Sequence, residues 1–185
     1  MRKNLPRLTA TNWIEAALKI LEEKDINQVK IAPLAKILGV TKGSFYWHFK
    51  DRQALLDAML DHWHNEKTLD VINMIDAVSG IASERLLALL KAGVETLGTT
   101  RVEPAIRSWA RSDKQVNRIV CQVDTERLNY VKDLLMEIGN NESTAINKAR
   151  MVNFVRTGLF WTGDEMTKAE FNSFVEDLYQ ILIQH

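Results

Sequence analysis

The chain has little of what builds disulfide-stapled, β-rich or membrane-spanning proteins. Its 185 residues include one cysteine, Cys121, so an internal disulfide is excluded and a reducing compartment is favoured. Three prolines and eight glycines are few for the turns of a sandwich or barrel, and they favour helices with short connections. No apolar run approaches the roughly 20 residues of a membrane-spanning helix, and the basic start MRKNLPRLTA lacks the apolar stretch of a secretion signal. We expect a cytoplasmic protein with no membrane partner.

The formal net charge of the chain is zero, because 24 basic residues balance 24 acidic ones. The distribution of the charge is uneven, however. Residues 1–50 carry nine basic and four acidic side chains, a net +5, and the remaining 135 residues carry a net −5. A basic N-terminal segment on an acidic remainder is typical of a DNA-binding head on a larger body. The alternative is a charged surface that is unevenly shared by chance.

Residues 31–52, IAPLAKILGVTKGSFYWHFKDR, contain a helix-turn-helix pattern. The first helix has an apolar stripe at helical spacing, made of Ile31, Leu34, Ala35 and Leu38. Gly39 can take the left-handed conformation that ends this helix, and Thr41 is a good N-cap for a second one, TKGSFYWHF.

The second helix is unusual for a core element, since only Phe45 and Phe49, one turn apart, are expected to face inward. Its other side carries small, hydroxyl, basic and aromatic residues, which suit base edges, thymine methyls and phosphates in a DNA major groove. The predicted DNA-binding residues are Thr41, Lys42, Gly43, Ser44, Tyr46, Trp47, His48, Lys50 and Arg52. Lys42 is the best candidate for reading guanine O6 and N7. Lys50 and Arg52 are expected on phosphates, with solvated surface charge as their alternative. For the whole segment, the alternative is a helical hairpin with surface aromatics.

The stretch LGVTKGSFYWHFKDRQALLDAML resembles the turn, recognition helix and connecting-helix start of the tetracycline-repressor (TetR) family of transcriptional regulators. The resemblance has no gap from about Ala35 to Leu60, and a looser likeness continues through AIRSWARSDKQV and VDTERLNYV. It implies a homodimer on double-stranded operator DNA, with a small-molecule effector held in the body. It also implies DNA contacts by Tyr46, Trp47 and His48.

Hydrophobic periodicity predicts an all-α fold of about nine helices. Their expected ranges are 11–24, 31–38, 41–49, 51–77, 82–97, 103–111, 112–138, 143–161 and 167–183. Possible capping boxes are Asn12 with Glu15, Ser112 with Gln115 and Thr167 with Glu170. The expected domains are residues 1–52, a helix-turn-helix DNA-binding domain, and 53–185, a helical ligand-binding and dimerisation domain.

Two groups of body residues are candidates for binding, and for both the alternative is ordinary packing within one chain. The candidate ligand-binding residues are Trp63, Met74, Leu90, Val94, Arg107, Trp109 and Tyr130. The candidate dimer interface, on the last two helices, consists of Phe154, Val155, Leu159, Phe171, Phe174 and Leu178.

Catalytic and metal-binding patterns find no support. In the run DHWHNE, His62 is expected to pair with Glu66 while His64 points elsewhere, because residues two apart do not share a helix face. No HExxH, phosphate-binding glycine loop or catalytic triad pattern is present. We therefore expect no enzyme, no metal and no cofactor.

Taken together, these features predict a DNA-binding transcriptional regulator, most readily a repressor that a small molecule releases from a palindromic operator. One alternative is a transcriptional activator or a ligand-independent DNA binder. Another is a small-molecule-binding helical protein whose DNA-binding head is non-functional.

Overall fold

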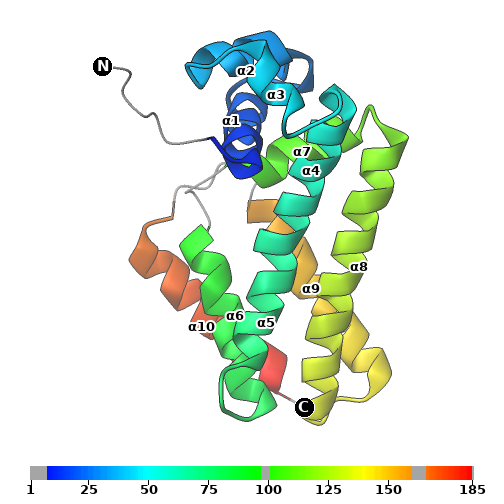
Figure 1. Ribbon diagram of the computed structural model, residues 1–185. Coiled ribbons are helices and arrows are strands. Elements are labelled where there is room, and N and C mark those ends of the chain that lie inside the picture. The colour runs from blue at the N-terminus through cyan, green and yellow to red at the C-terminus, as the bar shows by residue number, and fades with distance from the viewer. Residues whose placement is uncertain (1–7, 97–100, 160–165, 185) are drawn as a thin grey trace.

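All regular elements of the described residues, 8–96, 101–159 and 166–184, are helical in the computed structural model (Figure 1). When α4, α5 and the π-helical turn between them are counted as one helix, these ranges contain the nine helices that were predicted. The all-α prediction is confirmed. No helix within these ranges is both long and apolar enough to cross a membrane.

The N-terminal head consists of α1 (Ala10–Glu23), a 3-10 turn (Ile26–Gln28), α2 (Ile31–Ile37) and α3 (Lys42–Tyr46). The backbone N–H of Thr9, the N-cap of α1, donates to Asn12 Oδ1 at 2.9 Å. The helix therefore starts earlier than predicted, and the expected box of Asn12 with Glu15 is wrong. Asn12 completes the box that begins at Thr9.

A long helix leads from the head into the body, as predicted for residues 51–77. It comprises α4 (Arg52–His64), a π-helical turn (Asn65–Leu69) and α5 (Asp70–Asp76). Its buried face steps from Trp63 to Thr68, five positions instead of the usual three or four, and the π-helical turn absorbs the extra residue. Leu69, although apolar, is exposed next to the buried Thr68.

The body contains α6 (Ala82–Thr96), α7 (Val102–Ala110), α8 (Lys114–Glu137), α9 (Glu142–Leu159) and α10 (Lys168–Ile183). Helix α9 packs along α8 and α10 packs along α6, while α7 lies between α1 and α8 (Figure 1). Thr167 and Glu170 form the predicted capping box. At α8 the cap is Asp113 instead of Ser112, because the Asp113 carboxylate accepts from the N–H groups of Gln115 and Val116. Residues 97 and 160–161 of the predicted helices lie outside the described ranges.

Two apolar clusters organise this arrangement. The first joins α1 to α4 with α7 and the first half of α8, and the second joins α6, the second half of α8, α9 and α10. The core of the head is thus continuous with α7, and its packing does not stop at residue 52. The division of the chain at that residue stays a prediction.

Candidate functional site

The outer helix of the head, α3, is held in place by aromatic side chains. Phe45 is fully buried, and its ring lies edge-on to Trp13 with the ring centroids 5.3 Å apart. The Phe49 ring lies 5.4 Å from that of Phe45. Aromatic pairs of this kind contribute about 0.5–1.5 kcal/mol beyond the burial of their area. The inward orientation predicted for Phe45 and Phe49 is confirmed, and it turns the opposite side of α3 toward solvent.

The turn before α3 has the geometry that its sequence predicts. Gly39 has a φ of 68°, in the left-handed region. Its N–H donates to the Lys36 carbonyl at 3.2 Å, and the Val40 N–H donates to the Ala35 carbonyl at 2.9 Å. These two bonds make a Schellman motif, which satisfies the last carbonyls of α2 and fixes the angle between α2 and α3.

Helix α3 is shorter than predicted, since its α-helical part ends at Tyr46. Trp47 to Phe49 continue as a turn, in which the N–H groups of His48 and Phe49 both donate to the Phe45 carbonyl, at 2.9 and 3.0 Å. This turn presents Trp47 to solvent and returns Phe49 to the core.

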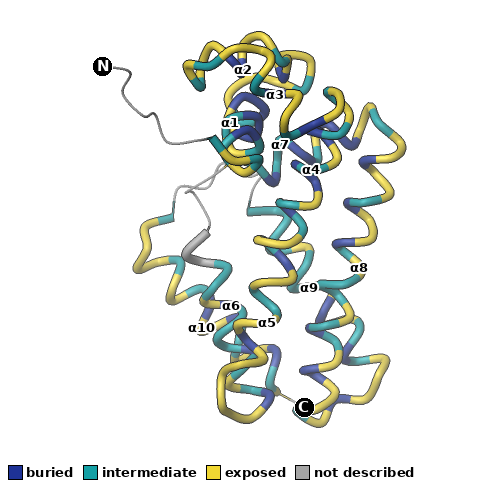
Figure 2. The backbone as a smooth tube through the Cα atoms, viewed as in Figure 1, coloured by how far each residue is buried: buried dark blue, intermediate teal, exposed yellow. Residues whose placement is uncertain are grey.

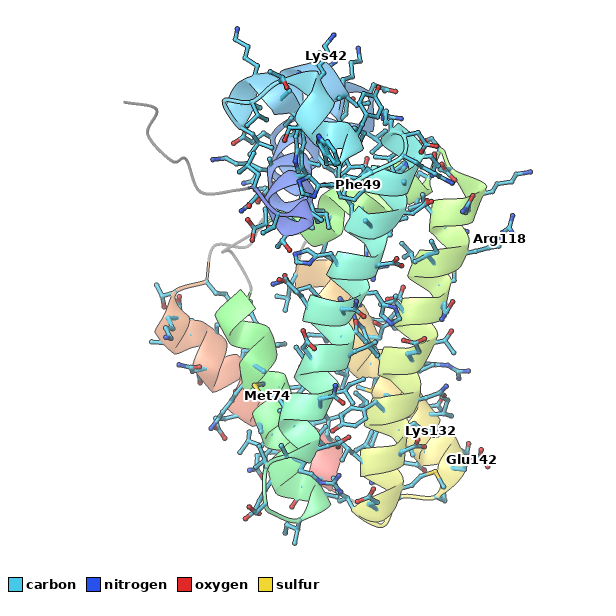
Figure 3. All side chains as sticks on the ribbon, in the orientation of Figure 1. Lys42, Phe49, Met74, Arg118, Lys132 and Glu142 are labelled. Atoms are coloured by element: carbon cyan, nitrogen blue, oxygen red, sulfur yellow. The ribbon has the colours of Figure 1, made fainter. Side chains whose placement is uncertain are left out.

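The predicted DNA-binding residues gather at one end of the molecule, where the outer rim formed by α2 and α3 is mostly exposed (Figure 2). Tyr46 is 59% exposed and Trp47 is 85% exposed. Lys42 projects from the outer end of the head (Figure 3). Thr41, Gly43 and Lys50 are exposed as well, whereas Ser44 and His48 are half-buried. Two large aromatic side chains, Tyr46 and Trp47, are thus exposed at this end of the molecule.

Arg52 has a structural role that its sequence position did not indicate. Its Nε donates to the Val29 carbonyl and its Nη2 donates to the Ile26 carbonyl, both at 2.6 Å. The guanidinium thereby ties the start of α4 to the loop between α1 and α2. Contact with phosphate stays a prediction for Arg52, but bracing of the head is what the side chain does in this structure.

The body contains an apolar cavity of about 220 Å³. Trp63, Leu90 and Tyr130 are the predicted ligand-binding residues that line it. The prediction that Met74 binds the ligand is wrong, because Met74 is 52% exposed on α5 and does not line the cavity. The prediction for Trp109 is also wrong, because Trp109 is buried in the apolar cluster that includes the core of the head. The side chain of Val94 lies outside the described part of the structure.

One end of the cavity carries a buried charged cluster centred on Glu103, which is 8% exposed. The Glu103 carboxylate accepts hydrogen bonds from Arg107, Arg127 and Arg156, at 2.8–3.0 Å. It also accepts one from the indole Nε1 of Trp63, at 3.0 Å. Arg107 and Arg156 in turn donate to Asp124. Arg107, the remaining candidate ligand residue, thus belongs to the cluster but does not line the cavity.

The cluster shifts the ionisation of its members. Burial alone would raise the pKa of Glu103, but the nearby guanidinium groups of Arg127, Arg156 and Arg107 outweigh burial and hold that pKa well below its ordinary value. For Arg127, burial dominates and lowers its pKa, even though Glu103 acts in the opposite direction. The side chain of Arg127 also lies over the Trp63 ring, with its Cζ 5.4 Å from the centroid.

Sequence reasoning missed Glu103, Arg127 and Arg156. The spacing of Glu103 and Arg107 is a local signal, because residues four apart share a helix face. The other two arginines lie on α8 and α9, 24 and 53 positions away from Glu103, and no local pattern connects them. The cluster also fastens the long helix, since Arg127 donates to Thr68 Oγ1 and to the Lys67 carbonyl in the π-helical turn.

The candidate dimer residues divide into two groups. Phe154 is 70% exposed on α9. Leu178 is buried inside the protomer, and Val155, Leu159 and Phe171 line the cavity with it, so these four are corrected to intrachain packing. Phe174 is half-buried and packs on the same apolar cluster. The reason is that α9 and α10 pack on different helices, α8 and α6, and turn their apolar sides inward.

The two histidines of α4 face different partners, as predicted. His62 Nε2 lies 3.2 Å from Glu66 Oε1, and His64 Nε2 lies 2.5 Å from Glu126 Oε2 on α8. In the described ranges, no group of three or more His, Cys, Asp and Glu side chains is arranged to hold a metal ion.

The head matches known proteins in sequence. Residues 14–59 match the model of the bacterial regulatory proteins of the tetR family. The same region is 36% identical over 56 residues to the HTH-type transcriptional regulator TtgR of Pseudomonas putida, covering 30% of this chain and 27% of that protein. It is 40% identical over 55 residues to the class D tetracycline repressor protein of Escherichia coli, covering 30% and 25%. The chain thus spans only about a quarter of the length of these curated relatives.

The fold matches solved structures over nearly the whole chain. A TetR-family transcriptional regulator from Streptomyces coelicolor superposes with a TM-score of 0.74 at 19% identity, covering 94% of this chain and 95% of that one. The fatty acid degradation regulator FadR from Bacillus halodurans gives 0.70 at 16% identity, covering 98% and 97%. These likenesses concern the fold alone. In sequence, the likeness to the tetR family of bacterial regulatory proteins covers the head, residues 14–59.

Proposed function

We propose that the protein is a transcriptional repressor that binds operator DNA through α3 and leaves it when a small molecule enters the body cavity. The observation that supports DNA binding most directly is the outer face of α3. Phe45 and Phe49 anchor this helix from within, while Lys42, Tyr46 and Trp47 stand exposed at the end of the molecule. The relative in E. coli is named a repressor, which agrees with this direction of control.

Each exposed side chain has a role that fits its chemistry. Lys42 would read guanine through O6 and N7, and Trp47 would pack on a sugar or a thymine methyl. Tyr46, His48 and Lys50 would contact phosphates and set the register of α3 in the groove. Thr41, Gly43 and Ser44, at the start of the same helix, would allow the close approach of its backbone.

A palindromic operator requires two heads, so we propose a homodimer. Phe154 and Met151, which are 70% and 47% exposed and lie one turn apart on α9, supply the apolar surface for pairing. The two heads would enter successive major grooves about 34–36 Å apart.

Release by a ligand requires contacts that differ between the DNA-bound and free states. The long helix supplies the link, because it begins in the head with α4, and Trp63 of α4 lines the cavity together with Lys67 and Thr68 of the π-helical turn. Helix α7 supplies a second link, since it packs on α1 and carries Glu103 at the end of the cavity. A ligand that moves these walls would change the separation of the heads.

The test is binding of selected DNA by the full chain. The Lys42→Ala variant should lose about 1–3 kcal/mol at the selected site and relax its sequence preference, whereas Tyr46→Phe should weaken all sequences alike. Lys132→Ala is the control, because Lys132 lies at the opposite end of the molecule from Lys42 (Figure 3).

Three outcomes would count against the proposal. Unchanged DNA affinity in both head variants would reject the interface. If no DNA sequence is selected, the protein would instead be a helical ligand-binding protein whose DNA-binding head is non-functional. A selected sequence whose affinity no cavity ligand alters would leave a ligand-independent binder or an activator.

A further inference from the structure

The cavity is apolar along most of its wall and charged at one end. Valine, leucine and phenylalanine side chains from α6, α8, α9 and α10 form the apolar part. Glu103, Arg127 and Arg156 form the charged end together with Lys67 and Glu66. A molecule that fills this space must therefore have an apolar body and a polar end, because a buried apolar group cannot satisfy the charged wall.

The charges at the polar end are not balanced. Among the described residues, three cationic and two anionic side chains line the cavity, and the next pair behind them, Arg107 with Asp124, adds nothing to this excess of one positive charge. Burial lowers the pKa of Arg127, so Glu103 does not fully compensate the loss of water around this guanidinium.

The acceptors at this end are already occupied. Glu103 receives hydrogen bonds from three arginines and the Trp63 indole, and Asp124 receives them from two of these arginines. A cationic ligand would have to displace an arginine to reach either carboxylate. An anionic ligand needs only donors, and a guanidinium offers five of them.

Arg156 has the most accessible guanidinium group of the cluster around Glu103. Its side chain is 25% exposed, compared with 14% for Arg127 and 13% for Arg107. Among the described residues, its Nη atoms bond to Glu103, Asp124 and Asn153, and its Nε bonds to none. Asn153 lies one turn before it on α9 and lines the cavity as well.

The volume limits the size of the ligand. At about 220 Å³ the cavity is larger than the roughly 150 Å³ that hold a benzene molecule and smaller than the roughly 300–1,000 Å³ of a drug-sized site. From volume and charge together, we infer that the effector is a small carboxylic acid, bound as its anion, whose aliphatic or aromatic body lies along the apolar wall and whose carboxylate meets Arg156. This inference rests on the proposed function and specifies its ligand.

The experiment uses the full-length protein and matched probes that differ only in their polar end. Octanoate, octanamide and octylamine form one series, and phenylbutyrate with its amide and amine forms another. Binding is measured by calorimetry at neutral pH. Each carboxylate should bind at least tenfold more tightly than its amide, and the amines should bind least. An amide or amine that binds as well as its carboxylate, or no binding in either series, would overturn the inference.

Two variants test where the carboxylate lies. Arg156→Gln should reduce the preference for the acid over the amide to less than about threefold. Asn153→Asp keeps the size of the side chain but adds a negative charge beside Arg156, so it should remove the preference even if Arg156→Gln folds poorly. Arg118→Gln is the control, because Arg118 points away from the body (Figure 3). Retention of the full preference in both variants would also overturn the assignment.

Operator affinity, measured in parallel, tests the ligand class and the release of DNA by the ligand separately. Carboxylates that bind at Arg156 but leave DNA affinity unchanged would refute release by ligand and leave the ligand class standing. Release by amines or neutral compounds alone would refute the ligand class and leave the regulatory function standing.

Discussion

At the scale of single residues, Gly43 distinguishes what the fold needs from what the DNA-binding surface needs. A Cβ at this position would meet only Thr41 Oγ1, at 3.6 Å, which is an ordinary contact. The fold therefore does not require a glycine here. A need for it would have to come from a partner that approaches the backbone of α3.

This argument predicts opposite effects for one substitution. Gly43→Ala should raise the free energy of unfolding by about 0.4–1 kcal/mol, because alanine restricts the unfolded chain, and should weaken operator binding, because its methyl stands between the backbone and the DNA. Denaturant titration and DNA titration measure the two quantities. Full operator affinity in Gly43→Ala would exclude close backbone contact at this position.

Arg52 is the second informative residue. Arg52→Gln removes two charge-assisted hydrogen bonds to the carbonyls of Val29 and Ile26, so we expect a loss of stability on the order of 2–3 kcal/mol. Lys50→Gln, on a neighbouring exposed side chain, should leave stability unchanged and should reduce the salt dependence of DNA binding. Equal stabilities of the two variants would show that Arg52 does not brace the head.

At the scale of elements, the helices were largely predictable because each one carries its own periodic stripe and its own end signals. Gly39 and the pair Thr167 and Glu170 are local, so their effects could be inferred from a few neighbouring letters. The π-helical turn was not predictable from the stripe, because Leu69 is more apolar than its neighbour Thr68 and only packing decides that Thr68 faces inward.

In the candidate site, too, only the residues that local spacing places together could be predicted from the sequence. The face of α3 follows from helical spacing, whereas the cluster around Glu103 brings together residues of α4, α7, α8 and α9. The roles of Met74 and Trp109 were misassigned for this reason. Their size and apolarity suit a cavity, but which side of the bundle they occupy depends on how the helices pack.

The exposed face of α9 carries the prediction for assembly. Phe154→Glu should shift the protein toward monomer and lower operator affinity, because the charge would lie in the proposed interface. Met74→Glu, an exposed apolar position on α5, should change neither property. Sedimentation at micromolar concentration together with DNA titration tests both variants. A wild-type protein that sediments as a monomer and still binds its operator tightly would refute the dimer.

At the scale of the whole molecule, the Glu103 cluster makes stability depend on pH. The pKa of Glu103 is held below its ordinary value of 4.5, so its carboxylate binds a proton less readily in the folded protein than in the unfolded chain. The stabilisation is therefore fully present above about pH 4.5 and is lost progressively as the pH falls below that value.

Denaturant titrations between neutral and acidic pH test this dependence. Glu103→Gln should be less stable at neutral pH by about 3–5 kcal/mol, because three arginines lose their buried partner, and its stability should fall less steeply below pH 4.5 than that of the wild type. Glu137→Gln, at an exposed carboxylate that pairs with Arg85, is the control and should cost at most about 1 kcal/mol. Parallel acid profiles for wild type and Glu103→Gln would contradict the role of the cluster.

The π-helical turn in the long helix has a consequence for helical phase. An α-helix rotates by about 100° per residue, so one extra residue within a turn changes the azimuth of everything beyond it by that angle. Residues 65–69 contain this extra residue, between the part of the helix that packs in the head and the part that packs in the body. Arg127 holds the turn through hydrogen bonds to Thr68 Oγ1 and the Lys67 carbonyl, and it belongs to the charged cluster that lines the cavity. The direction in which the head faces is thus set by the winding of five residues, and three of them, Glu66, Lys67 and Thr68, also line the cavity.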